Sequence, residues 1–169
     1  MVEAHAPKRL LIVLGEGGHT KQMLRLVELL GPGYEYHYVI NRGDELSGRK
    51  LPFSGRTYTL IRPRAKQRGQ TDPFLKATWQ TVASIFQAWG VVRRIHPLAV
   101  IGAGPSICVP VSLVAKLYRA KIIHIETASR IHRPSLTGRI MYRLADLFFI
   151  QWETLRPYFP RAIYAGRLW

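Results

Sequence analysis

The segment LIVLGEGGHTKQML places a histidine directly after three glycines, between an aliphatic run and a segment with helical spacing of apolar residues. The glycines Gly15, Gly17 and Gly18 let the backbone turn tightly, and the N-terminus of a following helix attracts anions. His19 can contact such an anion or remove a proton from a hydroxyl group. The loop predicts a site for a phosphate or pyrophosphate, although glycine-rich turns also join strands to helices without binding anything. Because Thr20 stands where a dinucleotide-binding loop has its third glycine, a nicotinamide cofactor is not expected.

Two later segments add further polar groups. The loop GAGPS contains Gly102, Gly104 and Ser106 just before another expected helix, so it predicts a second anion-binding turn. The segment HIETASR follows an expected strand and contains Glu126 and Arg130. A carboxylate near two glycine-rich loops is a candidate for binding a hydroxyl group or acting as a general base, although it can also be an ordinary loop residue.

Strands and helices alternate along the chain in a way that brings these three loops together. Expected strands are 9–14, 34–40, 56–61, 98–102, 121–126, 146–151 and 162–165, and expected helices are 20–30, 73–94, 106–118, 135–144 and a short turn at 153–158. This alternation predicts one α/β domain over residues 1–169, with a doubly wound, mostly parallel, Rossmann-like sheet. In such sheets ligands bind at the carboxyl ends of the strands, which is where the three loops lie.

The chain is strongly basic, with 25 Lys and Arg against 10 Asp and Glu and a formal net charge of +15. No acidic residue occurs between Asp72 and Glu126, so the excess is regional. An anionic membrane, a phosphate-bearing substrate or nucleic acid would each complement this charge. The basic residues interrupt an α/β pattern rather than form a recognised nucleic-acid-binding module, so we expect no nucleic-acid partner.

The expected helix over 73–94 is a candidate for contact with a membrane or a partner protein. Its apolar residues cover about half of the circumference at 100° per residue, which is wider than core packing requires. Trp79 and Phe86 lie on one edge of this arc, and Ile85 and Val92 lie on the edge expected to face the sheet. Aromatic and aliphatic residues among Lys and Arg are typical of an interfacial helix. The residues expected at the membrane are Arg62, Arg64, Lys66, Arg68, Leu75, Trp79, Phe86 and Arg93.

Other sequence features limit the possible cofactors and locations. The single cysteine, Cys108, lies in the apolar run ICVPV, so we expect a buried thiol in a reduced, cytosolic protein. The six histidines are scattered, so we expect neither a metal site nor another cofactor. The N-terminal stretch lacks the pattern of a signal peptide, and Gly and Pro residues interrupt the longest uncharged window. We therefore expect no signal peptide and no transmembrane helix.

The chain resembles the asparagine-linked-glycosylation-fourteen family and its bacterial relatives in capsule and exopolysaccharide synthesis. It resembles, more remotely, the N-terminal half of the peptidoglycan lipid-linked N-acetylglucosaminyltransferase. The motifs that carry the resemblance are LGEGGHTKQML, YHYVINRGDELS, GAGPSICVP, HIETASR, SLTGRIMYRLADLFFIQWETL and YAGRLW. They occur in order and extend from Leu10 to Gly166.

This resemblance implies the acceptor-side subunit of a GT-B glycosyltransferase that is split into two polypeptides. A partner subunit would bind the UDP-sugar, and the heterodimer would transfer the sugar to a polyprenyl-pyrophosphate-linked saccharide in glycan or polysaccharide biosynthesis. Eukaryotic members carry an N-terminal membrane helix, which we do not expect here. The resemblance therefore implies a peripheral protein on the cytoplasmic face of a membrane, inactive alone.

The resemblance also assigns individual residues. Gly15, Gly17, Gly18 and His19 fall on the first glycine loop of the family, Gly102 and Gly104 on the second, and Glu126 and Arg130 on its E-S-x-x-R-like segment. We expect these glycines, with Thr20, Ser106 and Arg130, to bind the acceptor. Glu16 stands where the family usually has a small residue, and Thr127 replaces the usual serine.

Several alternatives stay open at the level of sequence. Either His19 or Glu126 could be the catalytic base. The chain could also be a stand-alone glycosyltransferase-like enzyme, although its length leaves no second half to bind UDP. The sequence identifies neither the sugar that is transferred nor the saccharide and lipid of the acceptor.

Overall fold

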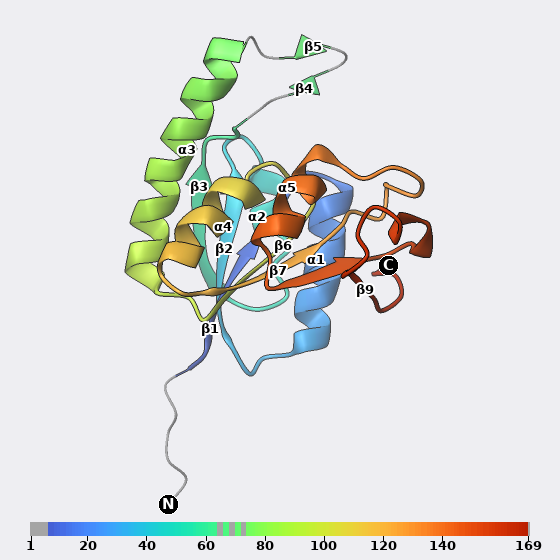
Figure 1. The fold of residues 1–169 in the computed structure, drawn as a ribbon. Coiled ribbons are helices and arrows are strands. Elements are labelled where there is room, and N and C mark those ends of the chain that lie inside the picture. The colour runs from blue at the N-terminus through green and yellow to red at the C-terminus, as the bar shows by residue number, and fades with distance from the viewer. Residues whose placement is uncertain (1–6, 64–65, 68–69, 72–73, 169) are drawn as a thin grey trace, which may run out of the picture.

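A computed structural model describes residues 7–63, 66–67, 70–71 and 74–168, with side chains for all of these except residues 45, 66–67, 70–71 and 74–77. Seven strands form one all-parallel sheet in the order β3-β2-β1-β6-β7-β8-β9 (Figure 1). These strands are β1 (Arg9–Val13), β2 (Glu35–Asn41), β3 (Gly55–Leu60), β6 (Ala99–Ala103), β7 (Lys121–Ile125), β8 (Leu147–Ile150) and β9 (Ile163–Tyr164). Two short strands, β4 (Lys66–Gln67) and β5 (Gln70–Thr71), pair antiparallel outside this sheet.

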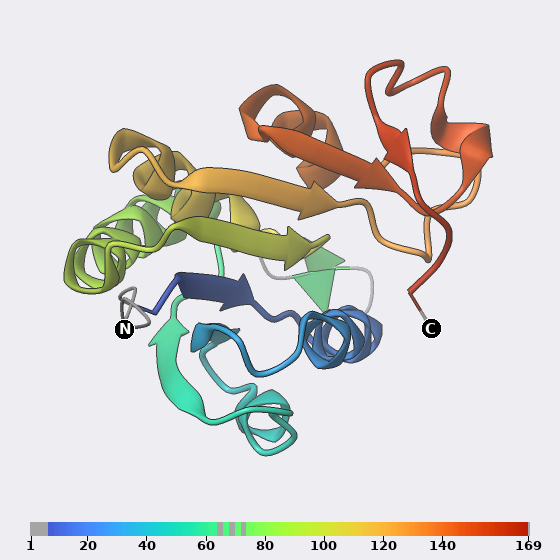
Figure 2. The same ribbon diagram turned by 90° about the horizontal axis from the view of Figure 1, so that it is seen from below.

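Helices cover both faces of the sheet. The helices are α1 (Gly18–Leu30), α2 (Glu45–Gly48), α3 (Phe74–Ile95), α4 (Cys108–Leu117) and α5 (Leu136–Leu144), with a 3-10 turn at Glu153–Leu155. The helices α3, α4 and α5 pack on one face, and α1 packs on the other (Figure 2). The expected α/β, doubly wound, parallel, Rossmann-like architecture is confirmed.

The central strands are apolar on both sides because both sides are covered. In β1, Leu11 and Val13 contribute to the core beneath α3 and α4, whereas Leu10 and Ile12 contribute to the core beneath α1. This alternation follows from the two-residue repeat of a strand, and full burial of each such side chain contributes roughly 1.5–3 kcal/mol. The sheet therefore forms a rigid base for the loops at its carboxyl edge.

The structure differs from the sequence expectations mainly in short elements. The helix α2 and the ribbon of β4 and β5 were not expected. Asp44 begins α2, because its Oδ1 accepts a hydrogen bond from the Ser47 N–H at 3.3 Å and its Oδ2 accepts one from the Ser47 hydroxyl at 2.6 Å. Helix α4 begins two residues later than expected, after turn-type hydrogen bonds from Cys108 N to Pro105 O and from Val109 N to Ser106 O. Within the described residues, every helix is too short or too polar to cross a bilayer.

Candidate functional site

A cavity of about 610 Å³ opens at the carboxyl edge of the sheet. Its walls are the last residue of β2, segments that follow β1, β3, β6 and β7, and the start of α5. The lining consists of Glu16, His19, Asn41, Arg62, Gly104, Pro105, Ser106, Thr127, Ser129, Arg130, Ser135, Leu136 and Thr137. We call this cavity the polar pocket. Its position agrees with the rule that parallel α/β sheets bind ligands where their strands end.

The imidazole of His19 lies between two glycines of different loops. A Cβ atom on Gly104 would lie 2.6 Å from His19 Cε1, and one on Gly15 would lie 2.8 Å from His19 Cβ. Gly104 also has a φ of 81°, a conformation that side chains with a Cβ rarely adopt. Glycine at these two positions therefore provides the space that the histidine fills, which explains part of the glycine pattern in the sequence.

The environment of His19 favours the neutral form of its ring. Burial lowers the pKa of His19 below its ordinary value of 6.5, and the positive charge of Arg62 lowers it further. The Nδ1 atom is buried and has no hydrogen-bond partner among the described residues. A neutral imidazole at pH 7 can accept a proton, as a general base must.

Glu16 and Arg62 form an ion pair at the rim of the polar pocket. Arg62 Nη1 lies 3.0 Å and 3.1 Å from the two carboxylate oxygens of Glu16. The pair is partly exposed, so its contribution to stability is small. It explains how an acidic residue is accommodated next to a site expected to bind an anion. Arg62, which was expected at the membrane, thus lies in the polar pocket, while its membrane role stays a prediction.

The helices around the polar pocket differ in how their N-termini are satisfied. Helix α5 begins with Ser135, whose hydroxyl accepts a hydrogen bond from the Gly138 N–H at 2.8 Å. In contrast, α1 and α4 begin after Gly17 and Ile107, without a side-chain cap and without an acidic residue in the first turn. At α1 the uncapped N–H groups and the helix dipole favour an anion. At α4 the N–H groups of Cys108 and Val109 already donate to the Pro105 and Ser106 carbonyls, and residue 110 is proline, so only the helix dipole favours an anion there.

The expected acceptor-binding residues separate into a group that lines a cavity and a group that does not, while Gly17 directly precedes α1. Gly104, Ser106 and Arg130 line the polar pocket together with His19. Gly18 lines a neighbouring cavity of about 630 Å³ that shares Ser129 with the polar pocket. The N-terminus of α1 therefore lies between the two cavities.

The second group lies behind the pocket walls. The hydroxyl of Thr20 is buried, donates a hydrogen bond to the Gly15 carbonyl and lies 2.8 Å from Ser47 Oγ. A Cβ atom on Gly102 would lie 2.5 Å from Cys108 Sγ. Gly15, Thr20 and Gly102 thus shape the loops by packing, and their predicted contact with an acceptor stays untested.

Glu126 also lies behind a wall. Its side chain has no exposed surface, and its Oε1 accepts a hydrogen bond from the Ser135 N–H at 3.0 Å. Burial raises the pKa of Glu126 above its ordinary value. The structure therefore separates the two candidate bases, with His19 in the lining of the polar pocket and Glu126 beneath the start of α5.

Some pocket residues were not expected from the sequence. Asn41 ends β2 and is 2% exposed, and its Oδ1 atom has no hydrogen-bond partner among the described residues. An unpaired buried acceptor is costly, so a donor such as a ligand hydroxyl group would stabilise it. The available signal was its position at a strand end, the same signal that identified the glycine loops. Thr137 and Ser135 were missed because their approach depends on how α5 packs.

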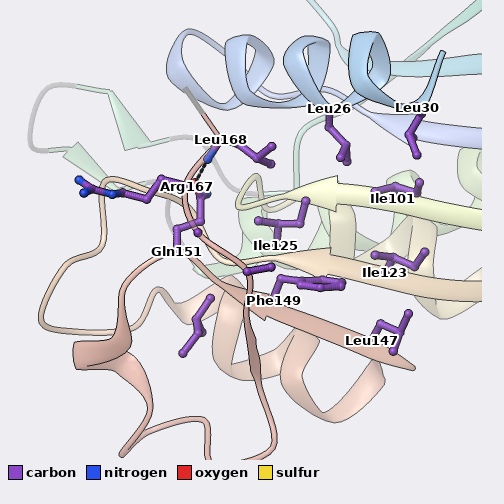
Figure 3. A pocket seen from close by; sticks show the side chains of 13 residues that line it. Leu26, Leu30, Ile101, Ile123, Ile125, Leu147, Phe149, Gln151, Arg167 and Leu168 are labelled. Atoms are coloured by element: carbon purple, nitrogen blue, oxygen red, sulfur yellow. Dashed lines mark hydrogen bonds between the residues drawn. The ribbon is translucent and has the colours of Figure 1, made fainter.

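An apolar cavity of about 290 Å³ lies on the face of the sheet that carries α1 (Figure 3). Side chains of β6, β7 and β8 form its floor, Leu26 and Leu30 of α1 form one wall, and the C-terminal segment forms another. We call it the apolar trough, and its lining is Leu26, Leu30, Ile101, Ile123, Ile125, Leu147, Phe149, Ile150, Gln151, Ala165, Gly166, Arg167 and Leu168. Such an opening is unusual in a parallel sheet, whose faces are normally covered.

The outer side of α3 presents a second apolar surface. Trp79 and Phe86 are 71% and 73% exposed, and Val82 and Trp89 are exposed between and beside them. We call these four residues the aromatic stripe. Val92 is buried and Ile85 packs against the core, so the helix divides as the sequence indicated. Arg93 is exposed near its C-terminal end.

Four other residues expected at the membrane cannot be placed in the same way. Arg64 and Arg68 lie outside the described residues, as does Pro73, the expected first residue of the helix. The side chains of Lys66 and Leu75 are also outside the description.

Among the described residues, no group of three or more His, Cys, Asp or Glu side chains could hold a metal ion.

Solved structures with the same fold include MurG and UDP-N-acetylglucosamine 2-epimerases. The MurG structure from Acinetobacter baumannii matches with a TM-score of 0.68 and 16% identity over 88% of this chain. A UDP-N-acetylglucosamine 2-epimerase from Rickettsia bellii matches with a TM-score of 0.70 and 13% identity over 95% of this chain. The chain spans 43% and 45% of these two structures, respectively. The expected Rossmann-like fold is therefore shared with just under half of each of these structures.

The sequence comparisons identify the family. The family described as "Oligosaccharide biosynthesis protein Alg14 like" matches residues 10–168. The protein named UDP-N-acetylglucosamine transferase subunit ALG14 from Rattus norvegicus is 35% identical over 94% of this chain and 82% of its own length. The protein of the same name from Yarrowia lipolytica is 33% identical over 97% of this chain and 82% of its own length. The chain belongs to the Alg14-like family of oligosaccharide biosynthesis proteins.

Proposed function

We propose that this chain is the acceptor-binding, membrane-associating subunit of a split GT-B glycosyltransferase. A partner subunit binds the UDP-sugar, and the pair transfers the sugar to a polyprenyl-pyrophosphate-linked saccharide. The observation that carries the proposal is the polar pocket, in which a neutral histidine in the uncapped first turn of α1 and two arginines meet at the carboxyl edge of a Rossmann-like sheet. The relatives named UDP-N-acetylglucosamine transferase subunit suggest UDP-N-acetylglucosamine as the donor to test first.

In this proposal the pocket binds the acceptor next to the donor. Arg62 and Arg130 offset the negative charge of the acceptor diphosphate, together with the N–H groups that begin α1. The acceptor hydroxyl faces His19, which takes the hydroxyl proton as the oxygen bonds to the anomeric carbon of the donor sugar. The bond between that carbon and the UDP oxygen breaks, and UDP leaves on the partner. Correct positioning and charge stabilisation are the main contributions of this chain.

We place one contact with the partner at the apolar trough. Both faces of a parallel sheet are normally covered, whereas the trough leaves strand residues such as Ile123 and Phe149 partly accessible. Relatives of this chain are named as a subunit, which supports the presence of a partner polypeptide. An apolar helix of the donor-binding partner would cover the trough and thereby place that partner next to the strand ends.

We place the membrane at the aromatic stripe. Exposed aromatic and aliphatic residues on one helix face, with Arg93 and Arg94 at its end, fit an interfacial helix on anionic lipid. Contact there would hold the protein peripherally at the cytoplasmic face, where a lipid-linked acceptor can reach the polar pocket. No nucleic acid takes part in this proposal.

Co-expression with the donor-binding partner tests the proposed function. Sugar transfer from UDP-N-acetylglucosamine to a polyprenyl-pyrophosphate-linked saccharide is measured with this chain alone, with the partner alone, and with the purified pair. We expect turnover only from the pair. Turnover from this chain alone would contradict the split enzyme, and lack of turnover from a stable, UDP-sugar-binding pair would contradict the acceptor role.

A further inference from the structure

The carboxyl group of Glu126 is buried and is not part of the lining of the polar pocket. Glu126 follows β7, and two hydrogen bonds fix its backbone. The Glu126 N–H donates to the Phe149 carbonyl at 2.8 Å, and the Glu126 carbonyl accepts from Gln151 Nε2 at 3.0 Å. Its side chain is absent from the lining of the pocket and has no exposed surface. A reacting hydroxyl group in the pocket therefore cannot contact this carboxyl group in the observed arrangement.

The carboxyl group instead lies against the first turn of α5. Its Oε1 accepts a hydrogen bond from the Ser135 N–H at 3.0 Å. Its Oε2 lies 1.6 Å from the position that a Cβ atom on Gly138 would occupy. Only glycine at position 138 leaves room for this approach. Helix α5 has no acidic residue in its own first turn. Glu126, which lies in another part of the chain, supplies a carboxyl oxygen to the Ser135 N–H at the start of this helix.

The first turn of α5 is also a wall of the polar pocket. Ser135, Leu136 and Thr137 line the pocket, and the segment before them contributes Ser129 and Arg130. Movement of this turn would therefore move the groups that face an acceptor. A displacement of about 1 Å in such a wall is enough to reduce turnover substantially.

We propose that Glu126 is a positioning residue, and not the base, whose carboxyl group fixes the first turn of α5 as a wall of the acceptor site. This inference rests on the proposed function and assigns the proton transfer to His19.

Variants of Glu126 distinguish positioning from base catalysis in the purified pair. In Glu126→Gln the amide oxygen can still accept from the Ser135 N–H, so we expect kcat within about threefold of the original and an unchanged pH profile. In Glu126→Ala that acceptor is lost, so we expect KM for the acceptor to rise about tenfold, with a smaller effect on kcat. A base at Glu126 would instead make the Gln variant lose about 10²–10⁴-fold in kcat, which would overturn the inference.

A glycine pair gives a second test. In Gly138→Ala the new Cβ atom would displace the Glu126 carboxyl group, so we expect the same rise in KM as in Glu126→Ala. Gly90→Ala in α3 is the matched control, because nothing lies within 4 Å of its new Cβ atom. Equal kinetics for Gly138→Ala and Gly90→Ala would contradict the inference.

Amide hydrogen exchange separates failure of this inference from failure of the proposed function, because it needs no turnover. We expect exchange at residues 135–138 to be faster in Glu126→Ala than in Glu126→Gln, which should resemble the unmodified chain. If exchange follows this pattern and the unmodified pair is inactive, the proposed function fails while the contact stands. If the pair is active and exchange at residues 135–138 is the same in all three proteins, this inference fails while the proposed function stands.

Discussion

The polar pocket and the apolar trough share strands β6 and β7 and differ in the chemistry of their linings. The polar pocket is formed by segments beyond the strand ends and contains Arg62, Arg130 and the unpaired acceptor of Asn41. The apolar trough is formed by side chains within the strands, such as Ile123 and Phe149, on one face of the sheet. Loops at the edge can change without disturbing the core, whereas strand residues must match whatever covers them.

This difference indicates that the two regions serve different partners. Unsatisfied polar groups and positive charge are stabilised by a polar, anionic ligand, whereas an uncovered strand face is stabilised by apolar contact. A substitution in one region should therefore affect one function and leave the other unchanged. Three predictions test this separation, from the largest expected effect to the smallest.

The largest effect is expected for His19→Ala in the polar pocket. Loss of a general base should reduce kcat of the purified pair by about 10²–10⁴-fold while the affinity for the partner stays unchanged. The pKa of His19 lies below 6.5, so the unmodified pair should stay active through neutral pH and lose kcat/KM only as the pH falls through that lowered value and the ring is protonated. Rates between pH 5 and 8 and a binding isotherm provide the measurements.

His132→Ala is the control for this prediction, because His132 is exposed in the loop before α5 and does not line the polar pocket. It should retain activity. The assignment of the base would be wrong if His19→Ala retained turnover or if the acid limb of its pH profile persisted.

A smaller effect is expected for Leu147→Arg in the apolar trough. An arginine there would place a charge against the apolar surface of the partner, so we expect the dissociation constant of the pair to rise by about 30-fold. Leu117→Arg at the end of α4 is the matched control, because it places the same charge on an exposed leucine outside the trough. Equal affinities of the two variants, measured by calorimetry, would exclude the trough as the docking surface.

The smallest effect is expected for Trp79→Glu in the aromatic stripe, which belongs to neither cavity. The change removes an interfacial aromatic ring and adds a negative charge near anionic lipid, so co-sedimentation with anionic vesicles should fall by about tenfold or less. Partner affinity and turnover on a detergent-dispersed acceptor should not change. Leu29→Glu on the outer side of α1 is the control, and an identical loss in that variant would mean that the effect is general charge repulsion.

The fold was predictable because the sequence repeats one local pattern. Aliphatic runs such as residues 9–14 alternate with amphipathic segments such as 20–30, and this alternation alone specifies a doubly wound parallel sheet. The short helix α2 was missed because its four residues give no periodicity. The Asp44 cap was its available signal.

The candidate site was predictable only in part. Glycine loops and strand ends identified His19, Gly104, Ser106 and Arg130, because their positions follow from chain order in a parallel sheet. The orientation of Glu126 was not predictable, since it depends on a glycine twelve residues later that α5 brings against it. The place of Arg62 in the polar pocket was not predictable either. Its ion pair with Glu16 joins residues that are far apart in sequence, so the sequence indicated only that Arg62 belongs to a basic segment.

The parallel arrangement of all seven strands also determines how the protein can be handled. The seven strands of the sheet all run in the same direction (Figure 1). They end at the edge that carries the polar pocket, and Lys8 directly precedes β1 at the opposite edge. A tether attached before Lys8 would hold the protein to a sensor chip by the edge opposite its ligand site. Immobilised in that orientation, the chain would present the strand ends to soluble glycolipid analogues, so that acceptor and partner could be added in either sequence and their binding recorded separately.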